Sequence, residues 1–307
     1  MNCLLKTKNH RVTTAPELHW RPSFSCSCLH AAKALLDGKP LADARLAAAL
    51  DGPARELQRQ MDVAGLPSAA LWRHLIPLSA SIESNRELAE TALVKVVGRN
   101  GRLDLLTAGI AQAIAALEAA MHTHLPRLAE ELPLRVGPLR EQWEARGPGL
   151  LRRMVQQTEE DLLPPRAEVV VVHPACGSGG NACLNYNLVT IEGVLANPHP
   201  ELPEVVRLGW LITQLNSDLP RYGENIHPDR LPHVAGFALL PPALHAAEDV
   251  ELARYSPELV ATAIQAWGLA MPAGVDATTL VIDWWATYFD ARPAWSVALT
   301  ALDRMFE

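Results

Sequence analysis

The residues best suited to chemistry gather in one glycine-rich stretch near the middle of the chain. It starts at His173 and Cys176 and continues with small and polar residues, Gly177, Ser178, Gly179, Gly180 and Asn181. A cysteine close to a histidine could act as a nucleophile, because a neighbouring imidazole favours the thiolate form. No oxyanion-binding motif or third, orienting residue accompanies Cys176 and His173, so an inert thiol in a turn is the alternative interpretation.

The backbone N–H groups of residues 177–181 could surround an anionic ligand. A phosphate-binding loop needs a Lys after its last glycine, at the start of a helix, and this stretch has neither. The dinucleotide fingerprint also opens a helix, whereas the residues that follow here alternate as in a strand. We therefore expect a glycine turn between two strands, and residues 177–181 together with Arg207 are the candidate ligand contacts.

Two glutamates beyond this stretch, Glu192 and Glu204, could serve as an acid–base pair. Glu192 lies in an alternating segment, where its carboxylate either faces solvent or pairs with a cation such as Arg207 or His173. Glu204 is close to the start of a predicted helix, where the helix dipole favours negative charge. Arg207 follows three residues later, a spacing that permits an ion pair with Glu204.

Soft metal ligands occur near the N-terminus as Cys26, Cys28 and His30, with Cys3 and His19 further away. A structural zinc site usually repeats a pair of cysteines that are two to four residues apart. The second pair is missing here, so two buried or incidental thiols at the start of a helix are the favoured interpretation. We predict no metal and no cofactor.

The elements that hold the glycine-rich stretch are predicted to be two strands and a helix. Residues 168–173 are apolar on both faces, as in a strand buried on both sides. Residues 187–195 alternate, and the short connection suggests that the two strands are neighbours and antiparallel. A helix is expected from 203 to 216, after Pro203.

The rest of the chain reads as helical, so the predicted fold is mainly α with a small sheet (α+β). We expect an irregular arm over residues 1–22, helical hairpins over 23–163 and an α+β region over 164–307, with Pro164-Pro165 stopping the preceding helix. Within the helical region, Gly52-Pro53 predicts the end of one helix and the start of another.

Composition limits the class of protein. The 307 residues are 49% hydrophobic and 20% charged with a net charge of −7, which argues against a general nucleic-acid binder. Five cysteines favour free thiols in a reducing compartment, and the N-terminus lacks the apolar core of a secretory signal. The best uncharged apolar run, 105–117, is shorter than the roughly 18–20 residues of a membrane span. A cytoplasmic, soluble protein is expected.

The order of elements over residues 167–217 resembles the core of zincin-type metallopeptidases. In those proteins a strand precedes a helix with the motif H-E-x-x-H, whose two His bind zinc and whose Glu is the general base. Here Glu204 would occupy the base position, and Pro203 and Arg207 would occupy the ligand positions. Proline has no donor atom and arginine stays protonated, so the resemblance implies a fold without catalytic zinc. The alternative is that Pro203 is the first residue of an ordinary helix.

Three functional hypotheses follow. The first is a non-catalytic protein that binds a partner protein or a small molecule in a groove beside the glycine-rich stretch. The second is a hydrolase or transferase that uses Cys176 with His173, or Glu192 with Glu204. The third is a helical scaffold whose N-terminal helices are the working surface. The lack of a complete catalytic set favours the first, and the oligomeric state is left open.

Overall fold

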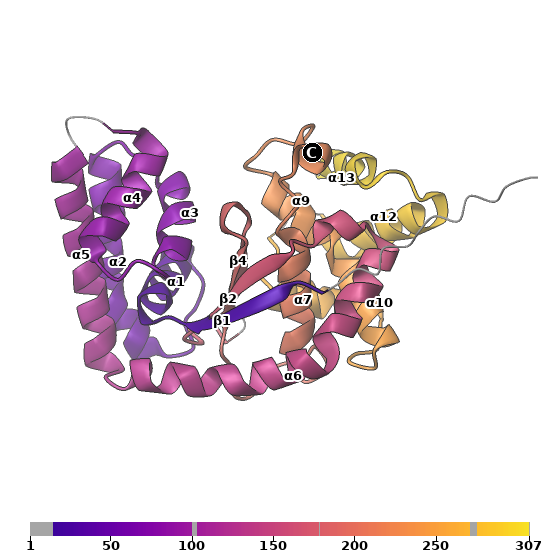
Figure 1. Cartoon of the computed structure of the whole chain (residues 1–307), viewed down its shortest axis with the longest axis horizontal. Helices are drawn as coiled ribbons and strands as arrows, with labels where there is room; N and C mark the ends of the chain where they lie inside the picture. The colour runs from indigo at the N-terminus through magenta and orange to yellow at the C-terminus, as the bar shows by residue number, and fades with distance from the viewer. Residues whose placement is uncertain (1–14, 100–102, 178, 271–274, 307) are drawn as a thin grey trace, which may run out of the picture.

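The computed structural model describes residues 15–99, 103–177, 179–270 and 275–306. Within these ranges a four-stranded sheet lies between two groups of helices, as Figure 1 shows. The prediction of a mainly helical fold with a small sheet is confirmed.

The first group contains five helices: α1 (Phe24–Leu36), α2 (Ala44–Val63), α3 (Ser68–Leu78), α4 (Asn85–Val97) and α5 (Leu103–His124). The predicted break at Gly52-Pro53 is wrong, because α2 continues through it. The apolar residues Leu46, Leu50, Ala54 and Leu57 form one buried stripe across the break. These residues pack in the hydrophobic core of the first helical group, called the N-terminal core below. Their burial stabilises the helix by more than the loss of the one backbone hydrogen bond that the proline removes.

Helix α5 is 22 residues long, and an 18-residue window within it has a mean hydropathy of 1.4. By length and composition alone it could cross a membrane, although the run at 105–117 is too short by itself. In this structure its residues Ile110, Ile114, Leu117 and Met121 are buried in the N-terminal core, with α2 and α4 as neighbours.

Helix α6 (Leu128–Gln157) is 30 residues long and runs along both helical groups (Figure 1). Its first turns place Leu128 and Leu132 in the N-terminal core. Trp143 and Leu150 belong to a second hydrophobic core, formed largely by α7 to α13 and called the C-terminal core below. Helix α6 therefore contributes side chains to both cores. The remaining helices are α7 (Glu204–Gln214), α8 (Pro220–Gly223), α9 (Leu231–Ala238), α10 (Leu240–Asp249), α11 (Pro257–Ala266), α12 (Ala277–Ala291) and α13 (Trp295–Met305), with short 3-10 turns at Glu160–Leu162 and Leu184–Tyr186.

The sheet has the order β1-β2-β4-β3, from β1 (Glu17–Pro22), β2 (Arg166–Val172), β4 (Leu188–Glu192) and β3 (Gly180–Cys183). Strands β1, β2 and β4 are parallel, and β3 is antiparallel to β4. The expected irregular arm is thus wrong for residues 17–22, while residues 1–14 lie outside the described part. The two predicted strands are neighbours but parallel, because β3 lies between them in the chain and reverses its direction.

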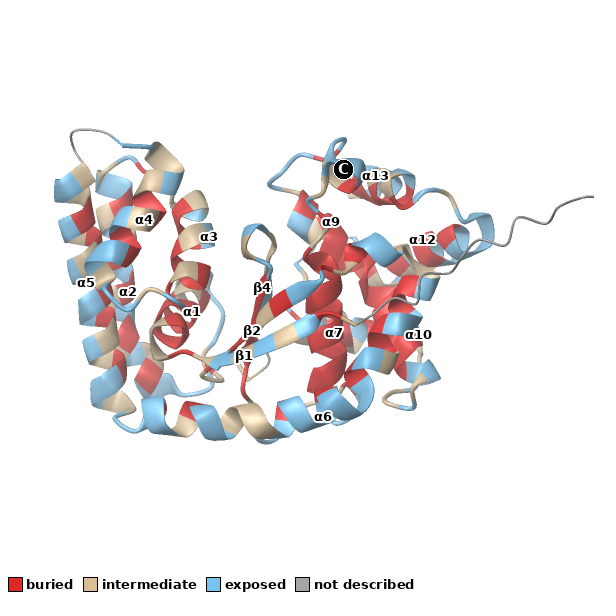
Figure 2. Ribbon diagram, in the orientation of Figure 1, coloured by how far each residue is buried: buried red, intermediate tan, exposed pale blue. Residues whose placement is uncertain are grey.

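The position of β2 between the two cores explains why its sequence is apolar. Val169 and Val171 pack in the C-terminal core, and Val170 and Val172 pack in the N-terminal core. All four valines are fully buried, in line with the sheet's position between two helical layers in Figure 2. A strand that is covered on both faces needs apolar side chains at every position.

Candidate functional site

The carboxyl ends of the three parallel strands meet at one edge of the sheet. In the register, Pro22 of β1 is opposite Val171, and Val172 of β2 is opposite Glu192 of β4. Helix α1 follows β1 after Ser23, whose hydroxyl caps the helix by accepting from the N–H of Cys26. The glycine-rich stretch follows β2, so three segments that are distant in sequence are brought to this edge.

Glu192, the last residue of β4, is the centre of this edge. Its side chain is fully buried, and its Oε1 lies 2.9 Å from Nε2 of His30 on α1 and 2.9 Å from the N–H of Cys176. Burial raises the pKa of Glu192, but the His30 hydrogen bond and charge and the N–H groups of Cys176 and Gly179 outweigh it and lower the pKa overall. An ionised carboxylate only accepts hydrogen bonds, so His30 Nε2 carries the proton in this contact.

The glycine-rich stretch does surround an anion, but that anion is the carboxylate of Glu192. Gly179 also accepts a hydrogen bond through its carbonyl from the backbone N–H of Glu192, at 3.0 Å. A Cβ on Gly179 would lie 2.5 Å from Glu192 Oε1 and 2.8 Å from His30 Nε2, which no side chain allows. Gly177 has a φ of 81°, in the left-handed region that favours glycine. The N–H groups of Cys176 and Gly179 are therefore occupied by Glu192, and Ser178 lies outside the described residues.

Glu204 and Arg207, on α7, form the ion pair that their spacing predicts. Arg207 is only 2% exposed, and its NH2 donates to Glu204 Oε1 while its NH1 donates to the carbonyl of Gly179 at 3.1 Å. Burial raises the pKa of Glu204, and Arg207 opposes that shift. Pro203 is the N-cap, one position before the first helical residue. The partner of Glu192 is thus His30, and neither Arg207 nor His173 takes that place.

Cys176 and His173 do not form an activated pair. Burial and the charge of Glu192 raise the pKa of the Cys176 thiol to about 11, against the opposing charge of Lys39. The thiol is therefore protonated at neutral pH. Burial lowers the pKa of His173, whose backbone N–H donates to Ser27 Oγ at 2.9 Å, and no hydrogen bond between Cys176 and His173 occurs among the described residues.

The two N-terminal cysteines belong to the core. Cys26 and Cys28 are fully buried, and burial raises the pKa of Cys26 to about 12. Within the described ranges no group of three or more His, Cys, Asp or Glu side chains is placed to hold a metal ion, and Cys3 lies outside those ranges. His30, the third member of the suggested set, is bound to Glu192.

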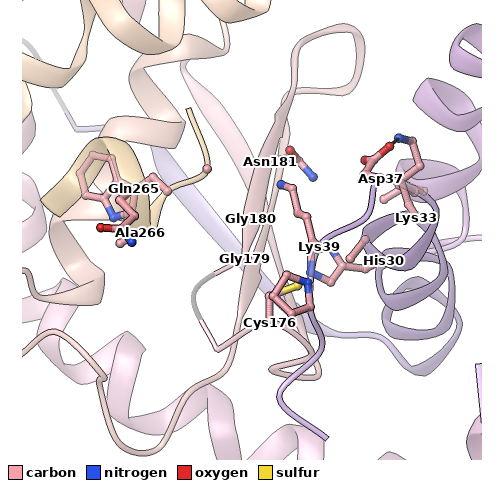
Figure 3. A pocket seen from close by; sticks show the side chains of 15 residues that line it. His30, Lys33, Asp37, Lys39, Cys176, Gly179, Gly180, Asn181, Gln265 and Ala266 are labelled. Atoms are coloured by element: carbon pink, nitrogen blue, oxygen red, sulfur yellow. Dashed lines mark hydrogen bonds and ion pairs between the residues drawn. The ribbon is translucent and has the colours of Figure 1, made fainter. Parts of the chain in front are cut away.

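A pocket of about 290 Å³ opens above the Glu192–His30 pair. Its walls come from α1, the loop between α1 and α2, the glycine-rich stretch and the end of α11, as Figure 3 shows. The lining residues with polar or aromatic groups include His30, Lys39, Cys176, Asn181, Gln265 and Trp267. Of the predicted ligand contacts, Gly179, Gly180 and Asn181 line this pocket, whereas Gly177 and Arg207 do not.

Lys39 is a lining residue that the sequence analysis did not identify. Helix α1 ends in a glycine turn, in which Gly38 has a φ of 73° and the N–H of Lys39 donates to the carbonyl of Ala34 at 2.9 Å. Three residues later the N–H of Ala42 donates to the carbonyl of Ala175 at 2.8 Å, which ties this loop to the glycine-rich stretch. The helix-ending glycine is visible in the sequence, but nothing local shows which residues Lys39 faces.

Comparisons with protein families, with curated proteins and with solved structures found no match to this chain. The resemblance to zincins therefore stays a prediction, and the arguments about function rest on the pocket and the side chains around it.

Proposed function

We propose that this protein binds a small molecule in the pocket between α1 and the end of α11, without transforming it. The observation that carries the proposal is the buried Glu192–His30 pair beneath the pocket. Taking an ionised carboxylate such as that of Glu192 out of water costs free energy that an apolar residue of similar size would not cost. Such pairs beside a cavity therefore often serve binding or catalysis.

The position and size of the pocket also support the proposal. Ligands of open parallel sheets commonly bind beyond the carboxyl ends of the strands, and this pocket lies beside the residues that follow β2 and end β4. Its volume of about 290 Å³ is close to the lower end of the usual range for small-molecule sites, roughly 300–1,000 Å³. A compact metabolite is therefore the class of ligand that fits.

The experiment is a thermal-shift screen of the full chain against a library of small metabolites, followed by pocket variants. Gln265 is an exposed lining residue, so Gln265→Trp should fill the pocket without disturbing the core. Gln142→Trp makes the same change at an exposed position of α6 that does not line the pocket. A ligand that stabilises the wild type and Gln142→Trp but not Gln265→Trp supports the proposal. A ligand that stabilises all three equally binds elsewhere and contradicts it.

The second candidate function is acid–base catalysis, and one observation favours it. His30 lines the pocket, and Glu192 holds its ring from behind. A histidine that is oriented by a carboxylate is a common general base. In this function His30 and Glu192 would be the acting groups of a hydrolase or transferase. They would take the place of the two predicted pairs, Cys176–His173 and Glu192–Glu204. Conversion of a screened ligand by the wild type, lost in His30→Gln while binding persists, would favour this function.

The proposal includes the setting that the composition suggests, a soluble cytoplasmic protein without metal or cofactor and without a nucleic-acid or membrane partner. A protein partner or a scaffold role for the N-terminal helices is the remaining alternative. It predicts that variants on the outer surface of α2 to α5, rather than pocket variants, change binding. The zincin resemblance agrees with a non-catalytic role, since Pro203 and Arg207 would replace its zinc ligands, but the proposal does not depend on it.

A further inference from the structure

We infer that the ligand of this pocket is a small organic anion, whose carboxylate or phosphate is bound by Lys39. The inference rests on the proposed function, because it names the chemical class of the molecule that the same pocket takes. It also assigns the recognition of charge to a residue outside the glycine-rich stretch.

Of the lysine and aspartate side chains that line the pocket, Lys39 is the one without an ion pair among the described residues. Lys33 donates to Asp37 on the same helix, so these two charges compensate each other. Glu192, beneath the floor, is bound by His30 and by backbone N–H groups. Lys39 has no ion pair among the described residues, in a protein whose net charge is −7. A ligand with a negative group would supply the missing partner.

Lys39 is an exposed residue, and its ammonium group reaches across the pocket toward Gly268. A Cβ on Gly268, after α11, would be 3.2 Å from Lys39 Nζ, which shows how closely the ammonium approaches the opposite wall. In Figure 3 the side chains of Lys39 and Asn181 point into the same space. The Asn181 amide, and that of Gln265 on the opposite wall, can donate further hydrogen bonds to an oxyanion.

Several backbone N–H groups of the glycine-rich stretch already have partners within the protein. The N–H groups of Cys176 and Gly179 bind Glu192, and the N–H of Asn181 donates to Thr190 Oγ1 at 3.1 Å. Recognition of an external negative charge therefore falls to side chains. Among the pocket residues that the structure describes, Lys39 is the cation without a protein partner.

The remaining wall suggests a compact apolar body for the ligand. Trp267 is stacked on Trp210 with ring centroids 4.6 Å apart, so its position is held by a second ring. Ile76 and Ala34 contribute apolar surface on the other side of the pocket. A short carboxylic acid or phosphate ester with an apolar or aromatic body has both a negative group for Lys39 and an apolar surface for this wall.

The test compares matched anionic and neutral probes by calorimetric titration of the full chain at low salt. Benzoate and phenyl phosphate are the anions, and benzamide is the neutral counterpart of benzoate. We expect the wild type to bind benzoate about two- to fivefold more tightly than benzamide, the size of one exposed ion pair. Lys39→Met should abolish this preference and leave benzamide binding unchanged, and Lys39→Arg should retain the preference. Lys95→Met, which removes one positive charge at an exposed position of α4 outside the pocket, is the matched control and should retain it as well.

Three outcomes would overturn the inference. Equal affinity of the wild type for benzoate and benzamide would show that charge is not recognised. A preference that persists in Lys39→Met would place the recognition elsewhere. Binding of no probe up to about 10 mM would exclude small anions of this class. If the metabolite screen then yields a neutral ligand that Gln265→Trp blocks, the proposed function stands while this inference fails.

Discussion

Glu192 Oε1 and His30 Nε2 lie 2.9 Å apart, although 162 positions separate the two residues in the chain. His30 belongs to α1, which packs in the N-terminal core. Glu192 is the last residue of β4, and the residue before it, Ile191, packs in the C-terminal core. The pair therefore connects two separately packed halves of the molecule at the edge where the pocket opens. Its removal should affect both stability and the shape of the pocket.

The first prediction concerns the cost of breaking this pair. Glu192→Gln should lower the free energy of unfolding by about 3–5 kcal/mol, because it leaves His30 and the buried N–H groups without their charged partner. Glu168→Gln on β2 is the control, since its carboxylate is partly exposed and 4.0 Å from Arg21, a contact worth about 1 kcal/mol or less. Urea unfolding measures both. Equal losses in the two variants would contradict a special role for Glu192.

The second prediction is the pH dependence of the same contribution. The pKa of Glu192 in the folded protein is below its ordinary value of 4.5. The ionised carboxylate therefore stabilises the fold above pH 4.5, and this stabilisation is lost as the pH falls through the lower, folded-state pKa. The difference in unfolding free energy between the wild type and Glu192→Gln should be constant from pH 7 to 5 and shrink in more acidic solution. A difference that grows on acidification would contradict a lowered pKa of Glu192 in the folded protein.

The third prediction concerns Gly179. A methyl group there would overlap Glu192 Oε1, so Gly179→Ala should cost about 1–3 kcal/mol as an overpacked site and displace the His30 contact. Gly149→Ala is the matched control, because a Cβ on Gly149 in α6 meets only Val250 Cγ1, at an ordinary contact distance of 3.6 Å. That change should instead stabilise the helix by roughly 0.5–1 kcal/mol. A neutral effect at both positions, measured by urea unfolding, would count against the close approach at Gly179.

The fourth prediction is the slow alkylation of Cys176. With a thiol pKa of about 11, its rate of reaction with iodoacetamide should be low at pH 7 and keep rising beyond pH 9. Lys39→Met should slow the reaction further, because the charge of Lys39 lowers this pKa. Peptide mass spectrometry gives the rate for Cys176 alone, with Cys176→Ser as the blank. A rate that levels off below pH 8 would restore Cys176 as a thiolate nucleophile.

Local sequence patterns were sufficient for most of the helices and for the two main strands. The capping of α4 is an example, because Ser84 Oγ accepts from the N–H of Glu87 at 3.4 Å, as their spacing predicts. The apolar run in β2 and the ion pair of Glu204 with Arg207 were also readable. Each of these features depends on residues within one turn or one strand, where spacing determines which side chains share a face.

Local patterns were misleading where packing outweighed them. Three prolines, Pro133, Pro138 and Pro148, lie inside α6, although a proline inside a helix removes a hydrogen bond and usually interrupts or kinks the helix. Residues 17–22 show no strand pattern, yet all six pair with residues 166–171 of β2. The buried contacts that α6 makes with both cores, and the free edge of β2, supply stabilisation that no local propensity reports.

The sequence by itself determined the fold class, the two main strands and the helix that follows Pro203. Only the tertiary structure decided that Glu192 binds His30 rather than Arg207 or His173, and that Lys39 faces the same pocket. The physical reason is the parallel sheet. It aligns the ends of β1, β2 and β4 and so brings together side chains that are more than a hundred positions apart, and a parallel pairing leaves no signal in the spacing of residues along the chain.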